Sequence, residues 1–237
     1  MYNFIKTKLQ GMVGYALIPE GLETYPGLVA LHAFNQTPEA IYEIAKGFAE
    51  SGILVFVPRY TDASDGVVIS VNALRNLKTF KGVDQSRIGI FGISLGGTVA
   101  LLASTQEPVN FVIDVGGWVD LADLYNHLSK FPAGTPQKYI AELVKSTIGT
   151  PEENAEIYTL SSPITYVEKV TGKVLVIHGG RDTMVPLTQS QKLLERLREH
   201  NIEAKLEVIE DADYLFTGKE KEVVRISLEF LKTHKII

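Results

Sequence analysis

The residues most able to do chemistry surround Ser94, in the pentapeptide Gly92-Ile93-Ser94-Leu95-Gly96. An apolar run, Arg87 to Phe91, precedes it and small residues from Thr98 to Thr105 follow, which predicts a strand, a G-x-S-x-G turn and a helix. Such a turn holds its serine in a strained conformation that projects the hydroxyl clear of the sheet. Glycines flank it because a Cβ there would strike a neighbouring element. Ser94 is the predicted nucleophile; a Gly-Ser turn in another α/β protein is the alternative.

Acyl transfer by a serine also needs N–H groups that stabilise the oxyanion of the tetrahedral intermediate. Leu95 follows the nucleophile at the start of the expected helix, so its backbone N–H is the first predicted donor. The second donor is expected from the loop after the apolar run Leu28 to His32, which makes Ala33 or Phe34 the candidate.

A carboxylate that orients the general base is predicted at Asp182. The apolar run Lys173 to His178 continues as Gly179-Gly180-Arg181-Asp182, which places Asp182 at the carboxyl end of a strand. From there it can reach a residue on the next strand–helix loop. Asp182 instead pairs with Arg181 or caps a turn if the site lies elsewhere, and Asp114 and Asp120 are then the reserve acids.

The elements that must position these residues alternate between strands and helices. The first two strands form an antiparallel edge hairpin with its turn at Gln10-Gly11, and the later apolar runs are typical of buried parallel strands. We therefore expect an α/β fold with an open, mostly parallel sheet and helices on both faces. Expected strands cover 4–9, 12–18, 28–32, 53–57, 87–91, 109–115, 173–178 and 205–209; expected helices cover 37–52, 67–80, 98–105, 188–200 and 219–235.

One segment interrupts this alternation, because residues 118–160 contain no strand-like run. Leu121, Leu124 and Leu128 have the spacing of a helix face, and a second helix is indicated around 139–144. The segment follows a strand end, where α/β sheets bind ligands. We expect a small helical cap inserted into a single domain, 1–237; an ordinary crossover with a long loop is the alternative. Trp118 either lines the acyl pocket or packs against the cap.

Composition excludes several classes of function. The net charge is −5 and no cluster of Lys and Arg stands out, so nucleic acid and anionic membranes are not expected partners. The absence of cysteine excludes disulfides, thiolate catalysis and cysteine-based metal sites. We expect a cytoplasmic protein, because neither a secretory signal nor a membrane-spanning run is evident. Oligomeric state stays open.

Together these features resemble the α/β-hydrolase family, in particular its dienelactone-hydrolase and prolyl-oligopeptidase-like serine esterases. The resemblance covers nearly the whole chain. It rests on 31–34, where relatives usually have His-Gly, on 83–97 and on 174–182. Dienelactone hydrolases proper use a cysteine nucleophile, so the serine esterase branch is the better match. The resemblance implies no cofactor and no metal.

The sequence departs from this resemblance at the general base. Relatives carry the catalytic histidine in a segment like Gly-Ala-Asp-His-x-Phe after the final strand, whereas residues 210–216 here read Glu-Asp-Ala-Asp-Tyr-Leu-Phe. Tyr214 thus stands at the histidine position, through natural drift or through engineered inactivation. The chain's histidines are expected in structural or solvated roles: His32, His127, His178, His200 and His234.

The sequence thus predicts a serine hydrolase of small esters, acyl or short peptidyl substrates. A phenol ordinarily titrates near pH ~10, so a tyrosine does not replace an imidazole as base near neutrality, and turnover is expected to be impaired. The alternative is a non-catalytic relative that binds a small apolar ligand or a partner. Acyl transfer to an acceptor other than water would use the same residues.

Overall fold

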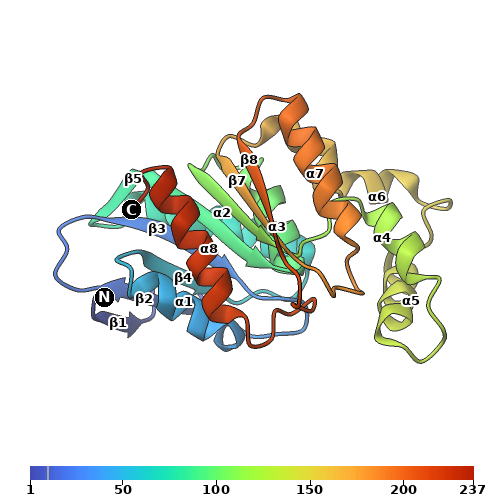
Figure 1. The fold of residues 1–237 in the computed structure, drawn as a ribbon, viewed down its shortest axis with the longest axis horizontal. Coiled ribbons are helices and arrows are strands. Elements are labelled where there is room, and N and C mark those ends of the chain that lie inside the picture. The colour runs from blue at the N-terminus through green and yellow to red at the C-terminus, as the bar shows by residue number, and fades with distance from the viewer. Residues whose placement is uncertain (10) are drawn as a thin grey trace.

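The structure, a computed structural model, describes residues 1–9 and 11–237 and contains an eight-stranded sheet (Figure 1). Its strand order is β1-β2-β4-β3-β5-β6-β7-β8. β1 pairs antiparallel with β2, and β2 with β4, whereas the neighbours from β4 to β8 pair in parallel. The strands are β1 Phe4–Thr7, β2 Gly14–Pro19, β3 Tyr25–Leu31, β4 Leu54–Pro58, β5 Val83–Ile93, β6 Phe111–Val115, β7 Lys173–Gly179 and β8 Ala204–Ile209.

The predicted mostly parallel α/β sheet and its antiparallel edge hairpin are confirmed. Within the predicted turn, Gln10 lies outside the described residues. Strand bounds differ from the expected ones by a few residues; β5 begins at Val83, because Val83 pairs with Tyr25 of β3 before a register shift leads to the pair of Gly27 and Ile88. β3, β4 and β6 are buried along their whole length, as expected for strands covered on both faces.

Helices cover both faces of the sheet. α8 packs with α1 on one face, through residues such as Phe48 and Phe230, and α2, α3 and α7 pack on the other, through Leu74, Val99 and Leu193. Figure 1 shows α8 in front of the strands with α2 and α3 behind them. These helices are α1 Tyr42–Ala49, α2 Ala63–Thr79, α3 Leu95–Ser104, α7 Leu187–Glu199 and α8 Glu220–Thr233.

The helix expected to open at Thr37 begins differently. A 3₁₀ turn, Pro38–Ile41, precedes α1, and the Thr37 side chain forms no capping hydrogen bond. The prediction of a capping hydroxyl was therefore wrong. Pro38 does stand at the first position of the turn, where its missing N–H costs no hydrogen bond.

The insertion between β6 and β7 contains helices and no strand in 118–160, and a short third helix that the sequence did not indicate. Its helices are α4 Leu121–Leu128, α5 Pro136–Ile148 and α6 Ala155–Leu160, and a 3₁₀ segment, η2 Pro163–Lys169, returns the chain to β7. We call α4, α5 and α6 the insertion helices. They lie to one side of the sheet, next to α7 (Figure 1).

The insertion helices pack on the loop that follows β7. Their apolar cluster joins Leu124, Leu128 and Tyr158 to Val185 of that loop. Thr183 of the same loop forms two hydrogen bonds with them, through its carbonyl at 3.2 Å from His127 Nε2 and through its hydroxyl, which accepts from Gln137 at 2.9 Å. The insertion is thus a packed layer rather than a long loose crossover.

Candidate active site

Ser94 occupies the sharp turn between β5 and α3, with φ 52° and ψ −119°. A residue with a Cβ seldom adopts a positive φ, because the side chain crowds its own backbone. Hydrogen bonds hold the turn in place: Ser94 N–H donates to Val115 O at 2.8 Å, and Ser94 O accepts from Gly97 N–H at 2.8 Å. Its side chain is half-buried. Ser94 therefore combines a strained backbone with a side chain that is only partly buried.

The glycines on either side of Ser94 are required by close backbone packing. A Cβ on Gly92 would lie 2.0 Å from the carbonyl oxygen of Gly96, and one on Gly96 would lie 2.6 Å from that of Leu31. Both distances are below any tolerable contact, and the atoms struck are backbone. Strand β5, helix α3 and the end of β3 therefore meet at separations that only glycine permits.

The two predicted oxyanion donors differ in their surroundings. Leu95 is the first residue of α3, and the first N–H groups of an α-helix have no acceptor within the helix. Ala33 N–H, in contrast, donates to Gln36 Oε1 at 3.2 Å within its own loop. This bond favours Phe34 over Ala33 as the second donor. The Phe34 side chain is 42% exposed at the edge of the sheet that carries Ser94.

Asp182 follows β7, which is separated from β5 and the nucleophile by one strand, β6, and it lies at the same edge of the sheet. Ser94 N–H bonds to Val115 O, and the next residue, Gly116, donates to Ile177 O at 2.8 Å, so the ends of β5, β6 and β7 are joined side by side. A Cβ on Gly116 would lie 3.7 Å from Asp182 Oδ2. One glycine thus separates the loop of the nucleophile from the carboxylate.

The Asp182 carboxyl group is buried and only half satisfied. Its Oδ1 accepts from the N–H groups of Met184 and Val185, both at 2.8 Å, whereas Oδ2 has no hydrogen-bond partner in the described part of the chain. Burial raises the pKa of Asp182 to about 6, against the opposing effect of the two N–H donors, and the carboxylate of Asp213 adds to the rise. Among the described residues Asp182 forms no ion pair with Arg181, but its Oδ1 does cap the turn that follows it, as the alternative expected, and His178 Nε2 lies 3.8 Å from Oδ2.

Tyr214 lies in the loop between β8 and α8, which packs directly on the Asp182 loop. Arg181 N–H donates to Ala212 O at 2.9 Å, and a Cβ on Gly180 would come within 2.6 Å of Glu210 O. Asp213 Oδ1 fixes the loop by accepting from the N–H groups of Leu215 and Thr217 at 3.0 and 3.2 Å. The half-buried Tyr214 therefore belongs to a hydrogen-bonded loop that packs on the Asp182 loop.

The buried ring of Phe216 also belongs to this region. It lies 3.2 Å from the position of a Cβ on Gly116, and its own φ is 58°. The ring thus covers the same glycine that borders Asp182 Oδ2, which helps to explain why that oxygen is shielded from water.

His178 is excluded as an alternative base by its own hydrogen bonds. Its Nε2 lies 3.0 Å from Val185 O, which only accepts, so Nε2 carries a hydrogen. Burial lowers the pKa of His178, so the ring is neutral and its Nδ1 accepts from the Ser190 hydroxyl at 2.7 Å. With both nitrogens engaged and no exposure, His178 supports the Asp182 loop instead.

His32 organises the loop after β3, as expected. Its Nδ1 donates to Ala33 O at 2.9 Å, and its ring stacks on Tyr60 with centroids 4.2 Å apart. The Tyr60 hydroxyl donates to His32 O, so the tyrosine packs on this loop. The remaining histidines contact Thr183 (His127), lie exposed at the end of α7 (His200) or pair with Glu203 (His234).

The reserve acids have other roles. Asp114 is fully buried on β6, where Oδ1 accepts from Gly117 N–H at 2.9 Å, and burial raises its pKa to about 7. A Cβ on Gly97 would lie 2.0 Å from that same oxygen, so Asp114 sits beneath α3 and not at the open edge. Asp120 caps α4 by accepting from Asp123 N–H at 3.0 Å.

Comparison with known proteins places this arrangement in a family. The family model described as the prolyl oligopeptidase family matches residues 70–235, which include Ser94, Asp182 and the loop of Tyr214. The chain belongs to the prolyl oligopeptidase family. It is therefore a member of a family of serine hydrolases, peptidases and esterases with the α/β-hydrolase fold, as the resemblance implied.

Relatives within and around the prolyl oligopeptidase family differ in length. The uncharacterized peptidase YtmA of Bacillus subtilis is 27% identical over 200 residues, which cover 78% of this chain and 74% of YtmA. Esterase LipC of Mycobacterium tuberculosis is 27% identical over 135 residues, which cover 53% of this chain and 33% of LipC.

Solved structures show the same fold. The acylaminoacyl peptidase of Pyrococcus horikoshii superposes with a TM-score of 0.74 at 22% identity, covering 98% of this chain and 41% of the peptidase. Est1E of Butyrivibrio proteoclasticus superposes with a TM-score of 0.73 at 17% identity and covers 98% of both chains. The chain thus spans less than half of the peptidase and nearly all of the esterase.

The sequence did not indicate two polar side chains near this site, Gln189 and Ser190. They lie in the first turn of α7 and are both fully buried. Ser190 shares the helical spacing of Leu193 and Leu197, which are core residues. A polar residue on an apolar helix face was the available signal, because a buried polar group needs a specific partner.

Two further observations concern metal ions and membranes. Within residues 1–9 and 11–237, no group of three or more His, Asp or Glu side chains is arranged to hold a metal ion. The same residues form no helix with the length and apolarity that crossing a membrane requires.

Proposed function

We propose that this chain hydrolyses small carboxylic esters or short acyl and peptidyl substrates with Ser94 as nucleophile, and that Tyr214 keeps its turnover low. The observation that carries the proposal is the strained φ of Ser94 at the end of β5, with the Asp182 carboxyl group at the end of β7, one intervening strand away. Leu95 and Phe34 supply the oxyanion N–H groups, and Asp182 is the acid that would orient a base.

The proposed reaction has a defined place for the negative charge that develops on the substrate. Ser94 Oγ attacks the carbonyl carbon, the carbonyl oxygen becomes an oxyanion, and the proton of Oγ must pass to a base. The positive end of α3 and the N–H of Leu95 stabilise the oxyanion. The leaving group then takes up a proton, and water releases the acyl group by the same route.

This mechanism lacks an effective general base. An ordinary phenol titrates near pH ~10 and stays protonated at neutrality, so Tyr214 does not accept the Ser94 proton as an imidazole would. Serine hydrolases that lack one member of the triad retain roughly 10³–10⁴-fold catalysis over water through the oxyanion hole and substrate binding. We expect slow turnover of activated esters at this level.

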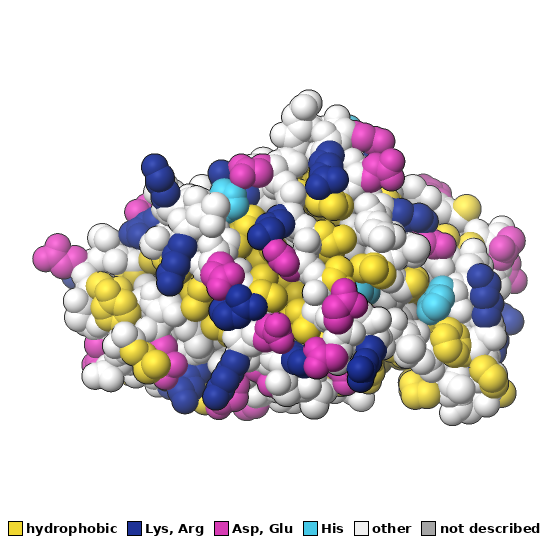
Figure 2. Space-filling model, viewed as in Figure 1, with side chains coloured by type: hydrophobic (Ala, Val, Ile, Leu, Met, Phe, Trp, Pro, Cys, Tyr) yellow, Lys and Arg dark blue, Asp and Glu magenta, His cyan; other side chains and the backbone are white. Residues whose placement is uncertain are grey.

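The proposed substrate is a small molecule, with the insertion helices as a cap that limits its size. On the face drawn in Figure 2, basic and acidic side chains are interspersed, which supports neither a nucleic acid nor an anionic membrane as partner. We further propose that the hydrolase needs neither a cofactor nor a metal, and that it works in the cytoplasm.

Restoring a histidine at the base position tests the function. We expect Tyr214→His to raise kcat/KM for p-nitrophenyl acetate and butyrate about 10²-fold or more, the usual contribution of a general base. Tyr214→Phe is the matched control and should leave the low activity unchanged, because the phenol does not act as a base. Fluorophosphonate should label Ser94 in all three proteins and fail to label Ser94→Ala.

The burial of Asp182 favours one other candidate function, ligand binding without catalysis. A carboxyl group with its pKa raised to about 6 is partly protonated near neutrality and holds an imidazolium less firmly. If the histidine variant neither hydrolyses esters nor labels with fluorophosphonate, the hydrolase proposal is abandoned and the chain is a binding relative of the family.

A further inference from the structure

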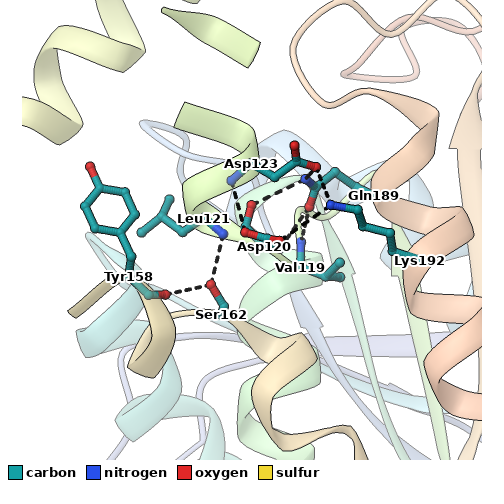
Figure 3. Close-up of polar contacts among 8 residues, drawn as sticks. All are labelled: Val119, Asp120, Leu121, Asp123, Tyr158, Ser162, Gln189 and Lys192. Atoms are coloured by element: carbon teal, nitrogen blue, oxygen red, sulfur yellow. Dashed lines mark hydrogen bonds and ion pairs between the residues drawn. The ribbon is translucent and has the colours of Figure 1, made fainter. Parts of the chain in front are cut away.

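Gln189 on α7 holds the chain at the point where it enters the insertion helices (Figure 3). Its side-chain oxygen accepts from the N–H groups of Val119 and Asp120, both at 2.9 Å. Its side-chain nitrogen donates to Asp120 O at 3.3 Å and to Asp123 Oδ2 at 2.9 Å. One buried amide thus forms four hydrogen bonds to the first residues of α4 and the segment before it.

This contact is specific for an amide. Gln189 is fully buried, and both halves of its side chain are used, the acceptor for two N–H groups and the donor for two oxygens. Lys192, one turn further along α7, adds an ion pair to Asp123 at 2.8 Å, and that bond raises the pKa of Lys192. Leucine at position 189 would leave the N–H groups of Val119 and Asp120 without an acceptor.

Ser190, the next residue of α7, connects the same helix turn to the Asp182 loop. Its hydroxyl donates to His178 Nδ1 at 2.7 Å, and His178 Nε2 donates to Val185 O at 3.0 Å. Val185 N–H in turn donates to Asp182 Oδ1. One turn of helix therefore bonds to the insertion through Gln189 and to the carboxylate loop through Ser190.

The segment bonded to Gln189 also contacts the helix of the nucleophile. Trp118 O accepts from Thr98 Oγ1 of α3 at 2.7 Å, and Gly117 N–H donates to Asp114 Oδ1. Residues 117–120 therefore lie between α3, which begins at the nucleophile, and α7, which follows the acid. Their position sets the separation between the insertion helices and the reacting groups.

We propose that Gln189 is a positioning residue that sets substrate size by fixing the insertion helices relative to the Asp182 loop; this rests on the proposed function. The amide acts through Val119 and Asp120 and touches no reacting atom. Its loss releases 117–120 and the start of α4, which widens the space for the acyl or leaving group without displacing Ser94.

Trp118 provides a direct readout of this contact that does not depend on activity. It is the single tryptophan of the chain and lies next to Val119. We expect Gln189→Leu to increase acrylamide quenching of tryptophan fluorescence at least about twofold, because segment 117–120 loses its three hydrogen bonds to Gln189. Gln191→Leu is the matched control, since Gln191 is exposed on the same helix and should leave quenching unchanged.

Kinetics in the Tyr214→His background separate positioning from a general loss of structure. We expect Gln189→Leu to raise KM for p-nitrophenyl butyrate about tenfold, as the loss of buried hydrogen bonds predicts, with kcat changed less than about twofold. The preference among acetate, butyrate and octanoate esters should shift toward octanoate. Equal losses in kcat and kcat/KM, or an unchanged ester preference, would overturn the proposal.

Gln189→Glu is a second variant that tests the proposal if Gln189→Leu does not fold. Combining it with Asp123→Asn tests whether the effect can be reversed. Gln189→Glu sets a carboxylate against Asp123 and should reproduce the increase in quenching and in KM. Adding Asp123→Asn removes that repulsion and restores a donor, so most of both changes should reverse. Tryptophan quenching equal to that of the unsubstituted chain in Gln189→Glu contradicts the inference, even where the histidine variant hydrolyses esters. Absence of hydrolysis with quenching increased contradicts the proposed function instead.

Discussion

Ser94 has a strained backbone conformation. A serine at φ 52° and ψ −119° lies outside the regions that residues with a Cβ ordinarily occupy. Gly92 and Gly96 permit the geometry by removing two side chains that would strike backbone. The strain persists because hydrogen bonds to Val115 and Gly97 hold the turn from both sides.

Ser94→Gly should therefore stabilise the protein while abolishing its chemistry. Glycine adopts a positive φ without steric cost, so we expect a gain of about 1–3 kcal/mol and a Tm higher by roughly 2–10 °C. Ser94→Ala keeps the Cβ and hence the strain, and it is the matched control. Thermal unfolding followed by circular dichroism checks both; an equal Tm for the two variants would show that the turn stores no strain.

At the scale of elements, loops from β5, β6, β7 and β8 meet at one edge of the sheet. Parallel pairing brings their carboxyl ends together, so groups distant in sequence, Ser94, Asp182 and Tyr214, come from neighbouring strand–helix loops. The insertion helices pack on the Asp182 loop through a separate small apolar cluster. The insertion helices should therefore be able to unfold locally while the sheet stays folded.

Leu128→Ala tests that independence. Leu128 is 1% exposed, and its truncation should cost about 2–5 kcal/mol locally, because the cluster around it is small and part of the loss is a cavity. Hydrogen exchange should accelerate in 121–148 and stay slow in β5 and β6. Leu160→Ala, at a 55% exposed position of α6, should change neither. Accelerated exchange throughout the sheet would mean that the insertion and the sheet unfold together.

At the scale of the whole molecule, two buried carboxyl groups connect stability to pH. Burial raises the pKa of Asp114 to about 7 and that of Asp182 to about 6, both above their ordinary values near 3.8. The native state therefore holds these protons more tightly than the unfolded chain does. Their contribution to stability is complete below pH ~4 and is lost as the pH rises through 6 and 7.

Asp114→Asn should remove part of this pH dependence. We expect the free energy of unfolding of the unsubstituted chain to fall between pH 5 and 7 relative to the variant, by up to about 1.4 kcal/mol per pH unit for one proton. Urea denaturation at several pH values measures the difference. The control Glu156→Gln changes an exposed carboxyl group and should run parallel to the unsubstituted chain. If the curve of Asp114→Asn also runs parallel to that of the unsubstituted chain, Asp114 is ionised across the whole pH range measured.

Local sequence predicted much of the fold and several candidates for the site. The run Leu28–His32, the glycines around Ser94 and the turn after His178 are readable because strand burial and glycine sterics act over a few residues. Thr37 failed as a cap, since a 3₁₀ turn intervened. Gln189 and Ser190 could not be assigned, because their partners lie 66 to 70 residues away for Gln189 and 12 for Ser190.

The sequence by itself determined the α/β class, and it predicted Ser94 as the nucleophile and Tyr214 at the position of the base, because each depends on residue type and near spacing. Only the tertiary structure decided that Ala33 N–H is already hydrogen-bonded within its loop and that both ring nitrogens of His178 form structural hydrogen bonds. It also decided that the Asp182 carboxyl group is buried with hydrogen bonds to one of its two oxygens. The physical reason is that desolvation and hydrogen bonding depend on which atoms the fold brings within about 3 Å, and chain order does not specify those neighbours.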